Sequence, residues 1–155
     1  MPTFRAYPYG STPITTDAIV IDRLGVGTEY VLISDLLNAF LYGAPYDIAM
    51  GYSNALPANS IVLNFIATRN FTTANLLAGS RAELITGGSS PVTLFIQRNG
   101  VQFGTVTFPT GNSSVGVFTG TAQTFSAGDL LEVVTPAVTL GANNLAITFA
   151  GTRIP

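Results

Sequence analysis

The chain of 155 residues is long enough for one ordinary domain, alone or with a small appendage. Apolar residues make up 47% of the sequence, so a core can be buried, whereas charged residues make up only 9%, against about a quarter in typical globular proteins. A net charge of −2 without a basic run argues against nucleic-acid binding, and the absence of cysteine and histidine excludes disulfides, thiolate or imidazole metal sites, and Ser-His or Cys-His catalysis.

The scarcity of charge predicts that partner subunits cover much of the surface, because a monomer with so few charges is poorly protected against association. All the basic residues are arginines, and a guanidinium tolerates burial at an interface better than an ammonium group. The opening MPTFRAYPYG lacks the basic start and apolar segment of a secretory signal, and no apolar run approaches the roughly 18 residues of a membrane span. We expect a protein that folds in the cytoplasm and binds no membrane.

The N-terminal part is predicted to form an extended arm followed by a small ββα unit. Residues 1–14 hold three prolines, which disfavour helices and central strands; the arm is either ordered against a partner or a frayed terminus. Strands are predicted over 17–22 and 29–33, with a glycine turn at 25–27. A short helix is predicted over 34–40, with Ser34 as its N-cap.

This unit is too small to be stable alone, so its apolar groups must rest on another surface. The helix presents one apolar face, and the arm carries two tyrosines of the kind that dominate interfaces, beside an arginine that can pair with an acidic partner. We therefore predict that residues 1–42 attach the protein to its partner. The predicted attachment residues are Arg5, Tyr7, Tyr9, Leu36, Leu37 and Phe40.

From residue 43 to 155 the pattern is strand and turn throughout. Short alternating segments bounded by Gly, Pro, Asn or Ser predict a mainly β domain, an antiparallel sandwich of jelly-roll type. In the first segment, Ile61, Leu63 and Phe65 are expected on one face. The predicted strand segments are 60–71, 78–88, 92–108, 114–125, 129–136 and 144–154.

Residues 92–108 predict a hairpin with Asn99-Gly100 at its turn. A three-residue loop, 98–100, with Gly100 left-handed would place the apolar residues on one face; a regular two-residue loop would mix the faces. The predicted inner set is Val92, Leu94, Ile96, Val106 and Phe108. Phe95, Val101 and Phe103 would then point outward, which predicts a contact with another subunit.

Carboxylate pairs are the remaining candidates for chemistry. Asp129 and Glu132 are close in sequence, and Asp17 and Asp22 bracket a strand, but a glycosidase needs two carboxylates that face each other across a sugar. We interpret Asp129 as a turn aspartate that accepts backbone N–H bonds, Glu132 as an edge residue, and Asp47 as a turn residue. No catalytic residue, metal site or cofactor is predicted.

Two stretches resemble parts of tailed-bacteriophage structural proteins. DAIVIDRLGVGTEYVLISDL (17–36) is similar to a short module near the start of such proteins: an apolar strand, Asp-Arg, a glycine turn, a second strand and Asp-Leu. The rest resembles a β-sandwich domain of phage virion and prophage tail-fibre proteins. The matching residues are Pro45-Tyr46-Asp47-Ile48-Ala49, Arg69, Gly79-Ser80, Asn99-Gly100, Gly104-Thr105, Ala127-Gly128-Asp129 and Gly151-Thr152-Arg153.

The resemblance implies a non-enzymatic virion structural protein that leaves the host by lysis. The expected role is a capsid decoration (cement) protein or short head fibre, a homotrimer bound to the major capsid protein or another virion protein, since no long repetitive shaft separates the two parts. The alternative is a receptor- or carbohydrate-binding fibre tip that recognises a host-surface glycan. That alternative predicts exposed aromatic platforms at Tyr9, Tyr46, Tyr52 and Phe103.

Overall fold

The computed structural model describes residues 18–23, 27–32, 43–112 and 114–154. The chain divides into two compact units, Met1–Leu41 and Tyr42–Pro155. The first contains an antiparallel hairpin of β1 (Ala18–Arg23) and β2 (Gly27–Leu32), with Asp22 paired to Thr28. The two strands predicted here are confirmed, each shifted by one or two residues. The predicted arm (1–14) and helix (34–40) lie outside the described residues.

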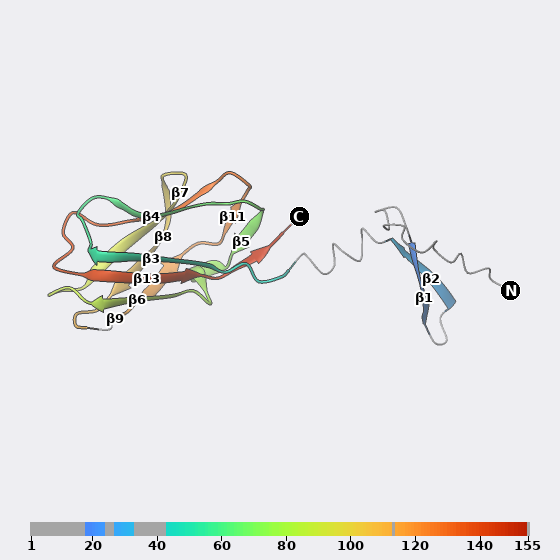
Figure 1. The fold of residues 1–155 in the computed structure, drawn as a ribbon, viewed down its shortest axis with the longest axis horizontal. Helices are drawn as coiled ribbons and strands as arrows, with labels where there is room; N and C mark the ends of the chain where they lie inside the picture. The colour runs from blue at the N-terminus through green and yellow to red at the C-terminus, as the bar shows by residue number, and fades with distance from the viewer. Residues whose placement is uncertain (1–17, 24–26, 33–42, 113, 155) are drawn as a thin grey trace. The chain divides into compact units, whose positions relative to one another are not determined.

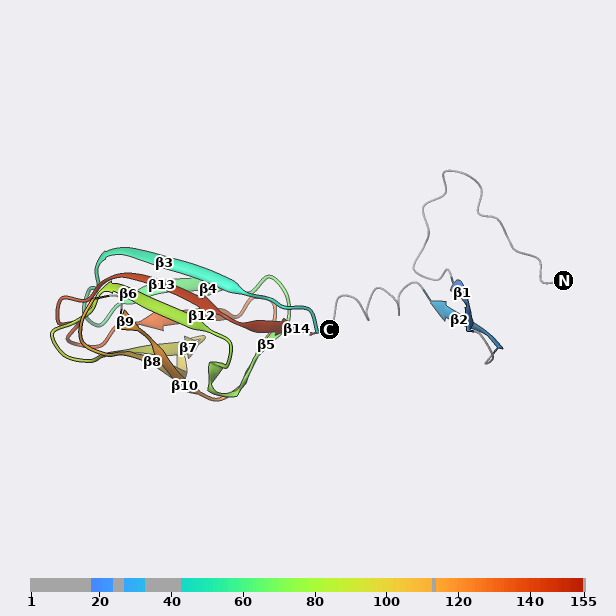
Figure 2. The same cartoon turned by 90° about the horizontal axis from the view of Figure 1, so that it is seen from below.

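The second unit is an antiparallel β-sandwich (Figures 1 and 2). One sheet has the order β10-β8-β7-β12-β4 and the opposing sheet the order β3-β13-β6-β9, while β11-β5-β14 form a small third sheet. The strands of the two large sheets are β3 (Ile48–Ala55), β4 (Ile61–Ile66), β6 (Arg81–Thr86), β7 (Val92–Arg98), β8 (Val101–Phe108), β9 (Ser114–Val115), β10 (Val117–Gly120), β12 (Leu130–Val134) and β13 (Asn143–Phe149). The third sheet consists of β5 (Phe71–Thr73), β11 (Gln123–Phe125) and β14 (Gly151–Arg153), and a 3-10 turn, η1 (Asn75–Leu77), follows β5.

The core lies between the two large sheets and takes its apolar residues from alternate positions of both. The five residues predicted on the inner face of the β7–β8 hairpin are all buried, at 2% exposure or less. From the opposing sheet, Leu84, Leu145 and Phe149 meet them in the same cluster. Burying alternate apolar side chains is what fixes which face of each strand points inward.

The turn of the β7–β8 hairpin differs from the prediction. Arg98 pairs with Val101, so the loop has two residues; Asn99 and Gly100 both have positive φ, 50° and 78°, as a type I′ turn requires. The alternation is restored by a β-bulge, because the ladder pairs Ile96 with Gly104 but Gln97 with Gln102 and leaves Phe103 extra. The three-residue loop was wrong because it assumed a regular ladder, although the positive φ of Gly100 is confirmed.

A second bulge changes the start of β4. The ladder to β12 pairs Val133 with Leu63 but Val134 with Ile61, so Val62 is the extra residue. Val62 is partly buried and packs against the core, whereas Ile61 is 55% exposed. The predicted alternation therefore holds from Leu63 to Ile66 and fails at Ile61.

The start and the end of the sandwich lie side by side. Pro45 forms an isolated antiparallel bridge with Thr152, and the N–H of Gly43 donates to the carbonyl of Arg153 at 2.9 Å. The N–H of Arg153 donates in turn to the carbonyl of Ala44 at 2.9 Å. The first residues of the unit thus extend the small sheet through β14.

Candidate functional site

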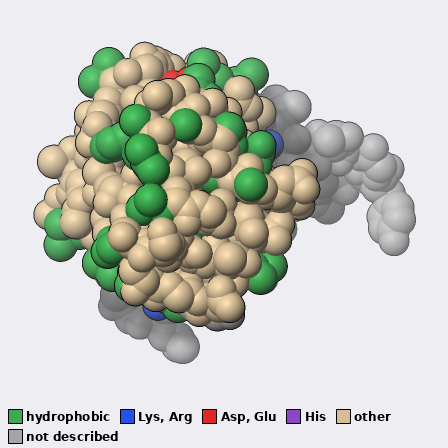
Figure 3. Space-filling model, turned by 90° about the vertical axis from the view of Figure 1, so that its left-hand side faces the viewer, with side chains coloured by type: hydrophobic (Ala, Val, Ile, Leu, Met, Phe, Trp, Pro, Cys, Tyr) green, Lys and Arg blue, Asp and Glu red, His purple; other side chains and the backbone are tan. Residues whose placement is uncertain are grey.

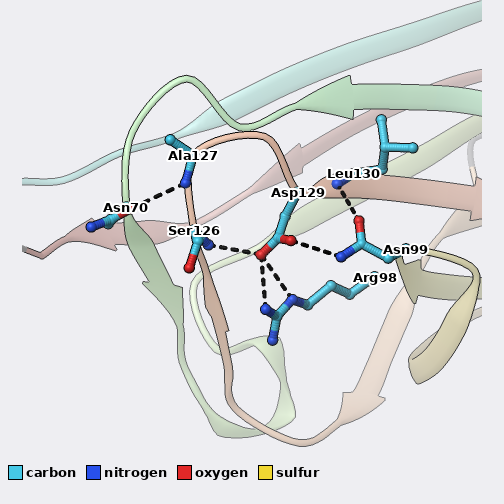
Figure 4. Close-up of polar contacts among 7 residues, drawn as sticks. All are labelled: Asn70, Arg98, Asn99, Ser126, Ala127, Asp129 and Leu130. Atoms are coloured by element: carbon cyan, nitrogen blue, oxygen red, sulfur yellow. Dashed lines mark hydrogen bonds and ion pairs between the residues drawn. The ribbon is translucent and has the colours of Figure 1, made fainter.

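The densest group of polar contacts surrounds Asp129, next to the β7–β8 turn (Figure 4). The Asp129 carboxylate accepts hydrogen bonds from Arg98 Nε at 3.0 Å, from the Ser126 N–H at 2.8 Å and from Asn99 Nδ2 at 2.7 Å. Arg98 Nη2 completes an ion pair at 2.8 Å, and Asn99 Oδ1 accepts the N–H of Leu130. We call these five residues the Asp129 cluster.

The sequence around Asp129 favours this arrangement locally. Ser126 to Asp129 form a turn in which the Asp129 N–H donates to the Ser126 carbonyl at 3.0 Å, and Gly128 has a φ of 97°, which glycine adopts without strain. The hydrogen bond from Asn99, followed by those from Ser126 and Arg98, lowers the pKa of Asp129 below its ordinary value. The prediction of a turn aspartate that accepts backbone N–H bonds is confirmed.

Glu132 has a different position from the predicted one. It lies on β12, which is hydrogen-bonded on one side to β7 and on the other to β4, so it is not on an edge strand. Its side chain is buried, with 6% exposure, and its carboxylate accepts the N–H of Gly100 at 2.7 Å. Both candidate carboxylates thus bond to the same hairpin, one to its Arg98-Asn99 segment and one to Gly100.

A shallow groove of about 340 Å³ lies beside the Asp129 cluster. The guanidinium of Arg98 lies 5.7 Å from the centroid of Phe125, and the Phe103 ring meets the same phenylalanine edge-on at 5.9 Å. The groove is lined by Arg98, Asn99, Val101, Gln102, Phe103, Thr121 and Gln123.

The three residues predicted to contact another subunit do not share one outward face of the hairpin, because the bulge lies among them. Val101 is 71% exposed, as expected of an outward residue, and Phe95 is half-buried in β7, opposite Thr105 and Val134. Phe103 is partly buried and packs against the core, so its prediction as an outward residue was wrong. The bulge at Phe103 turns its ring toward Phe125. The six predicted attachment residues lie outside the described residues.

The aromatic residues that were expected to form exposed platforms are partly buried wherever the structure describes them. Tyr46 and Tyr52 are both partly buried and pack against the core. The Tyr46 ring lies 5.1 Å from that of Phe71, and its hydroxyl is 3.2 Å from Thr68 Oγ1. The receptor-binding alternative predicted these residues to be exposed; Phe103 is also partly buried, and Tyr9 lies outside the described residues.

The other chemical candidates are few. Asp47 is exposed just before β3, while Asp17 lies outside the described residues. In the part of the chain that the structure describes, no group of three or more acidic side chains is placed to hold a metal ion, and no helix is both long and apolar enough to cross a membrane. The groove residues Gln102, Thr121 and Gln123 were missed because isolated polar residues in strands and loops carry no recognisable spacing.

The described residues thus form a β-sandwich with a mixed polar and apolar groove beside the Asp129 cluster. Neither a scan against models of protein families nor a search of the curated proteins found a match.

Proposed function

We propose that this chain is a non-enzymatic structural protein of a tailed-bacteriophage particle, a capsid decoration or short head-fibre protein. The observation that carries the proposal is the division into a small N-terminal unit and a larger sandwich with its own closed core. One part is then available for attachment while the other projects from or covers the shell. The motif order along the chain supports the same role.

Several residues that carry the resemblance have structural roles in the sandwich. Asn99-Gly100 forms the hairpin turn, and Ala127-Gly128-Asp129 forms the turn that holds the Asp129 cluster. Gly151-Thr152-Arg153 is β14, which pairs with β5. Such residues support a shared fold, and they supply no chemistry of their own.

We place the sandwich in the jelly-roll class on the strength of its strand order. Taking β9 and β10 as one strand, the last long strand, β13, lies between β3 and β6, and the long strand before it, β12, lies between β4 and β7. The chain changes sheet between β3 and β4, β4 and β6, β6 and β7, and β12 and β13, and it stays in one sheet for the β7–β8 hairpin, as in the double Greek-key arrangement of a jelly roll. This fold is used in virion shells, which is consistent with the proposed location in the particle.

Exposed apolar side chains support assembly, with a homotrimer as the expected state. Several β-branched residues of the sandwich are more than half exposed, a pattern that suits burial against other subunits. They are Ile61, Ile66, Ile85, Val101, Val115, Val117 and Val138. Mass measurement at micromolar concentration and moderate salt tests this, and a stable monomer would contradict it.

Attachment is assigned to residues 1–42. A chain that lacks them should stay folded by circular dichroism, because Tyr42–Pro155 is a compact unit with a core of buried residues of its own. It should no longer bind particles from which this protein has been removed, while the full chain rebinds. Rebinding of the shortened chain at full occupancy would place the attachment surface on the sandwich.

The second candidate function is a receptor- or carbohydrate-binding domain at a fibre tip, which the groove beside the Asp129 cluster favours. Electron microscopy of the particle with an antibody against this chain separates the two candidates. Labelling spread over the head supports decoration, and labelling at the end of a tail fibre supports receptor binding.

A further inference from the structure

The groove beside the β7–β8 turn is formed by two segments that are held in place. One wall is the hairpin segment from Arg98 to Phe103, and the other is the segment that carries Thr121 and Gln123. The N–H of Thr121 donates to the Phe103 carbonyl at 3.1 Å, which fixes the two walls to each other. The Asp129 cluster fixes the turn itself. A site with walls held in this way is largely formed before any ligand arrives.

The groove carries no uncompensated charge. Arg98 is the only charged side chain that lines it, and its guanidinium is already paired with Asp129 at 2.8 Å. An anionic ligand would have to compete with that carboxylate, and a cationic ligand would meet the guanidinium. The charges therefore favour a neutral ligand.

The polar groups of the groove both donate and accept hydrogen bonds. Gln102 is exposed, and Gln123 is half-buried with its Nε2 directed to Thr121 Oγ1 at 3.2 Å. A side-chain amide offers two donors and a carbonyl acceptor, and a hydroxyl offers one donor and two lone pairs. Sugar hydroxyls have the same double character and can match such groups without a net charge.

Apolar surface lies next to these polar groups. Val101 is 71% exposed, and the partly buried Phe103 contacts Phe125, which in turn stacks on Phe71 at 4.6 Å. The aromatic contacts fix the Phe103 ring in one orientation. Saccharides have apolar C–H faces beside their hydroxyls, so a site that combines amides with a rigid ring edge and a valine suits them.

We infer that this groove binds a neutral saccharide, with Gln102 and Gln123 as its polar contacts and Val101 and Phe103 as its apolar floor. The inference deepens the second candidate function and rests on it for its biological meaning. It names the site and the chemical class of the ligand: a neutral sugar rather than an acidic one.

The test uses the full chain and three probes, methyl α-glucoside, methyl β-galactoside and methyl N-acetyl-β-glucosaminide, each titrated separately while backbone amide resonances are followed. The expected result is saturable binding of at least one probe in the millimolar range, with shifts confined to residues 98–103 and 121–123. Failure of all three probes and of a neutral glycan array overturns the groove inference, but leaves the second candidate function, which antibody labelling tests, and the decoration proposal standing.

Variants locate the site. Gln102→Ala and Gln123→Ala should each weaken the binding by about threefold to tenfold, the effect of losing one neutral hydrogen bond. The matched control is Asn64→Ala, since Asn64 is an exposed amide on β4 opposite Glu132 and does not line the groove. Glycan binding that survives both groove variants unchanged retains the second candidate function and overturns this groove as its site. Preference for a neutral peptide over every sugar also overturns the inference.

Discussion

The two ends of the sandwich are held together in different ways. At one end, which we call the carboxylate end, the loops 67–70, 99–100 and 126–129 meet around Asp129, Arg98 and Asn99. At the other, the neutral end, the loops 56–60, 87–91, 109–112 and 135–142 contain no charged residue. Figure 3 looks onto the neutral end, where hydrophobic side chains lie among uncharged polar atoms and charged side chains are visible only near the margins.

The neutral end is held by hydroxyls and backbone groups. Thr135 Oγ1 accepts the N–H of Ser60 at 3.0 Å and lies 3.1 Å from the Ser60 carbonyl, to which it donates. Thr139 Oγ1 donates to the Leu56 carbonyl at 2.8 Å, and Ser114 Oγ donates to the Pro109 carbonyl at 2.9 Å. The comparison shows that the loops of one domain can be joined by ion pairs or by neutral hydrogen bonds alone. Only the contacts that involve an ionisable group respond to pH.

The largest expected effect separates the aromatic packing of the carboxylate end from its charges. Phe125 is fully buried, stacks on Phe71 and lies beneath Arg98, so Phe125→Ala should lower the free energy of unfolding by about 3–5 kcal/mol. Urea unfolding measures the loss. Phe95→Ala, at a half-buried position opposite Thr105, is the matched control and should cost clearly less. Equal losses for the two variants would mean that full burial and ring stacking at Phe125 add no stability over a half-buried phenylalanine.

The next effect tests the close approach of two loops at the neutral end. A Cβ on Gly87 would lie 2.0 Å from the carbonyl oxygen of Gly111, so Gly87→Ala must displace backbone and should cost about 2–3 kcal/mol. Gly100→Ala at the carboxylate end is the control. Its Cβ would meet nothing within 4 Å, so only the left-handed φ of 78° is strained, at a cost of about 1 kcal/mol. A reversed order in thermal or urea unfolding would contradict this account.

A third variant removes the hydroxyl that joins two loops of the neutral end. Thr135 is 1% exposed, and Thr135→Val leaves the Ser60 N–H without that acceptor, so the expected loss of stability is about 1–2 kcal/mol at every pH. Thr110→Val, at an exposed position of the same end, should be close to neutral. The two variants are compared by urea unfolding at neutral and at acidic pH. A loss for Thr135→Val that depends on pH would refute a purely neutral connection.

The smallest expected effect is the acid response of the carboxylate end. Because the folded-state pKa of Asp129 is lowered, its stabilisation is fully present above the unfolded-state value of about 4 and is lost as the pH falls through the folded-state pKa. Asp129→Asn should therefore be less stable than the parent chain at neutral pH, with the difference shrinking in acid. A difference that stays constant from neutral to acidic pH would show that the carboxylate charge is not responsible.

The β-sandwich class and most strands could be predicted because alternation is a local signal that each strand carries by itself. The inner residues of the β7–β8 hairpin were correct for this reason. The predicted loop length was wrong, because a bulge at Phe103 lets a two-residue turn and the apolar alternation coexist. Nothing in the sequence spacing marks that bulge. The predicted exposure of Tyr46 and Tyr52 was wrong for a similar reason, since exposure depends on which neighbours cover each ring.

The sequence by itself determined the absence of histidine and cysteine, the low charge, the Asn-Gly turn and the inner face of the hairpin, since these follow from composition and from a period of two residues. Only the tertiary structure decided the partners of Asp129, the burial of Glu132 on an internal strand, and the groove that Gln102 shares with Gln123. These features join residues far apart in the chain, such as Arg98 and Asp129. Strand pairing and bulges bring them together, and no local pattern encodes either one.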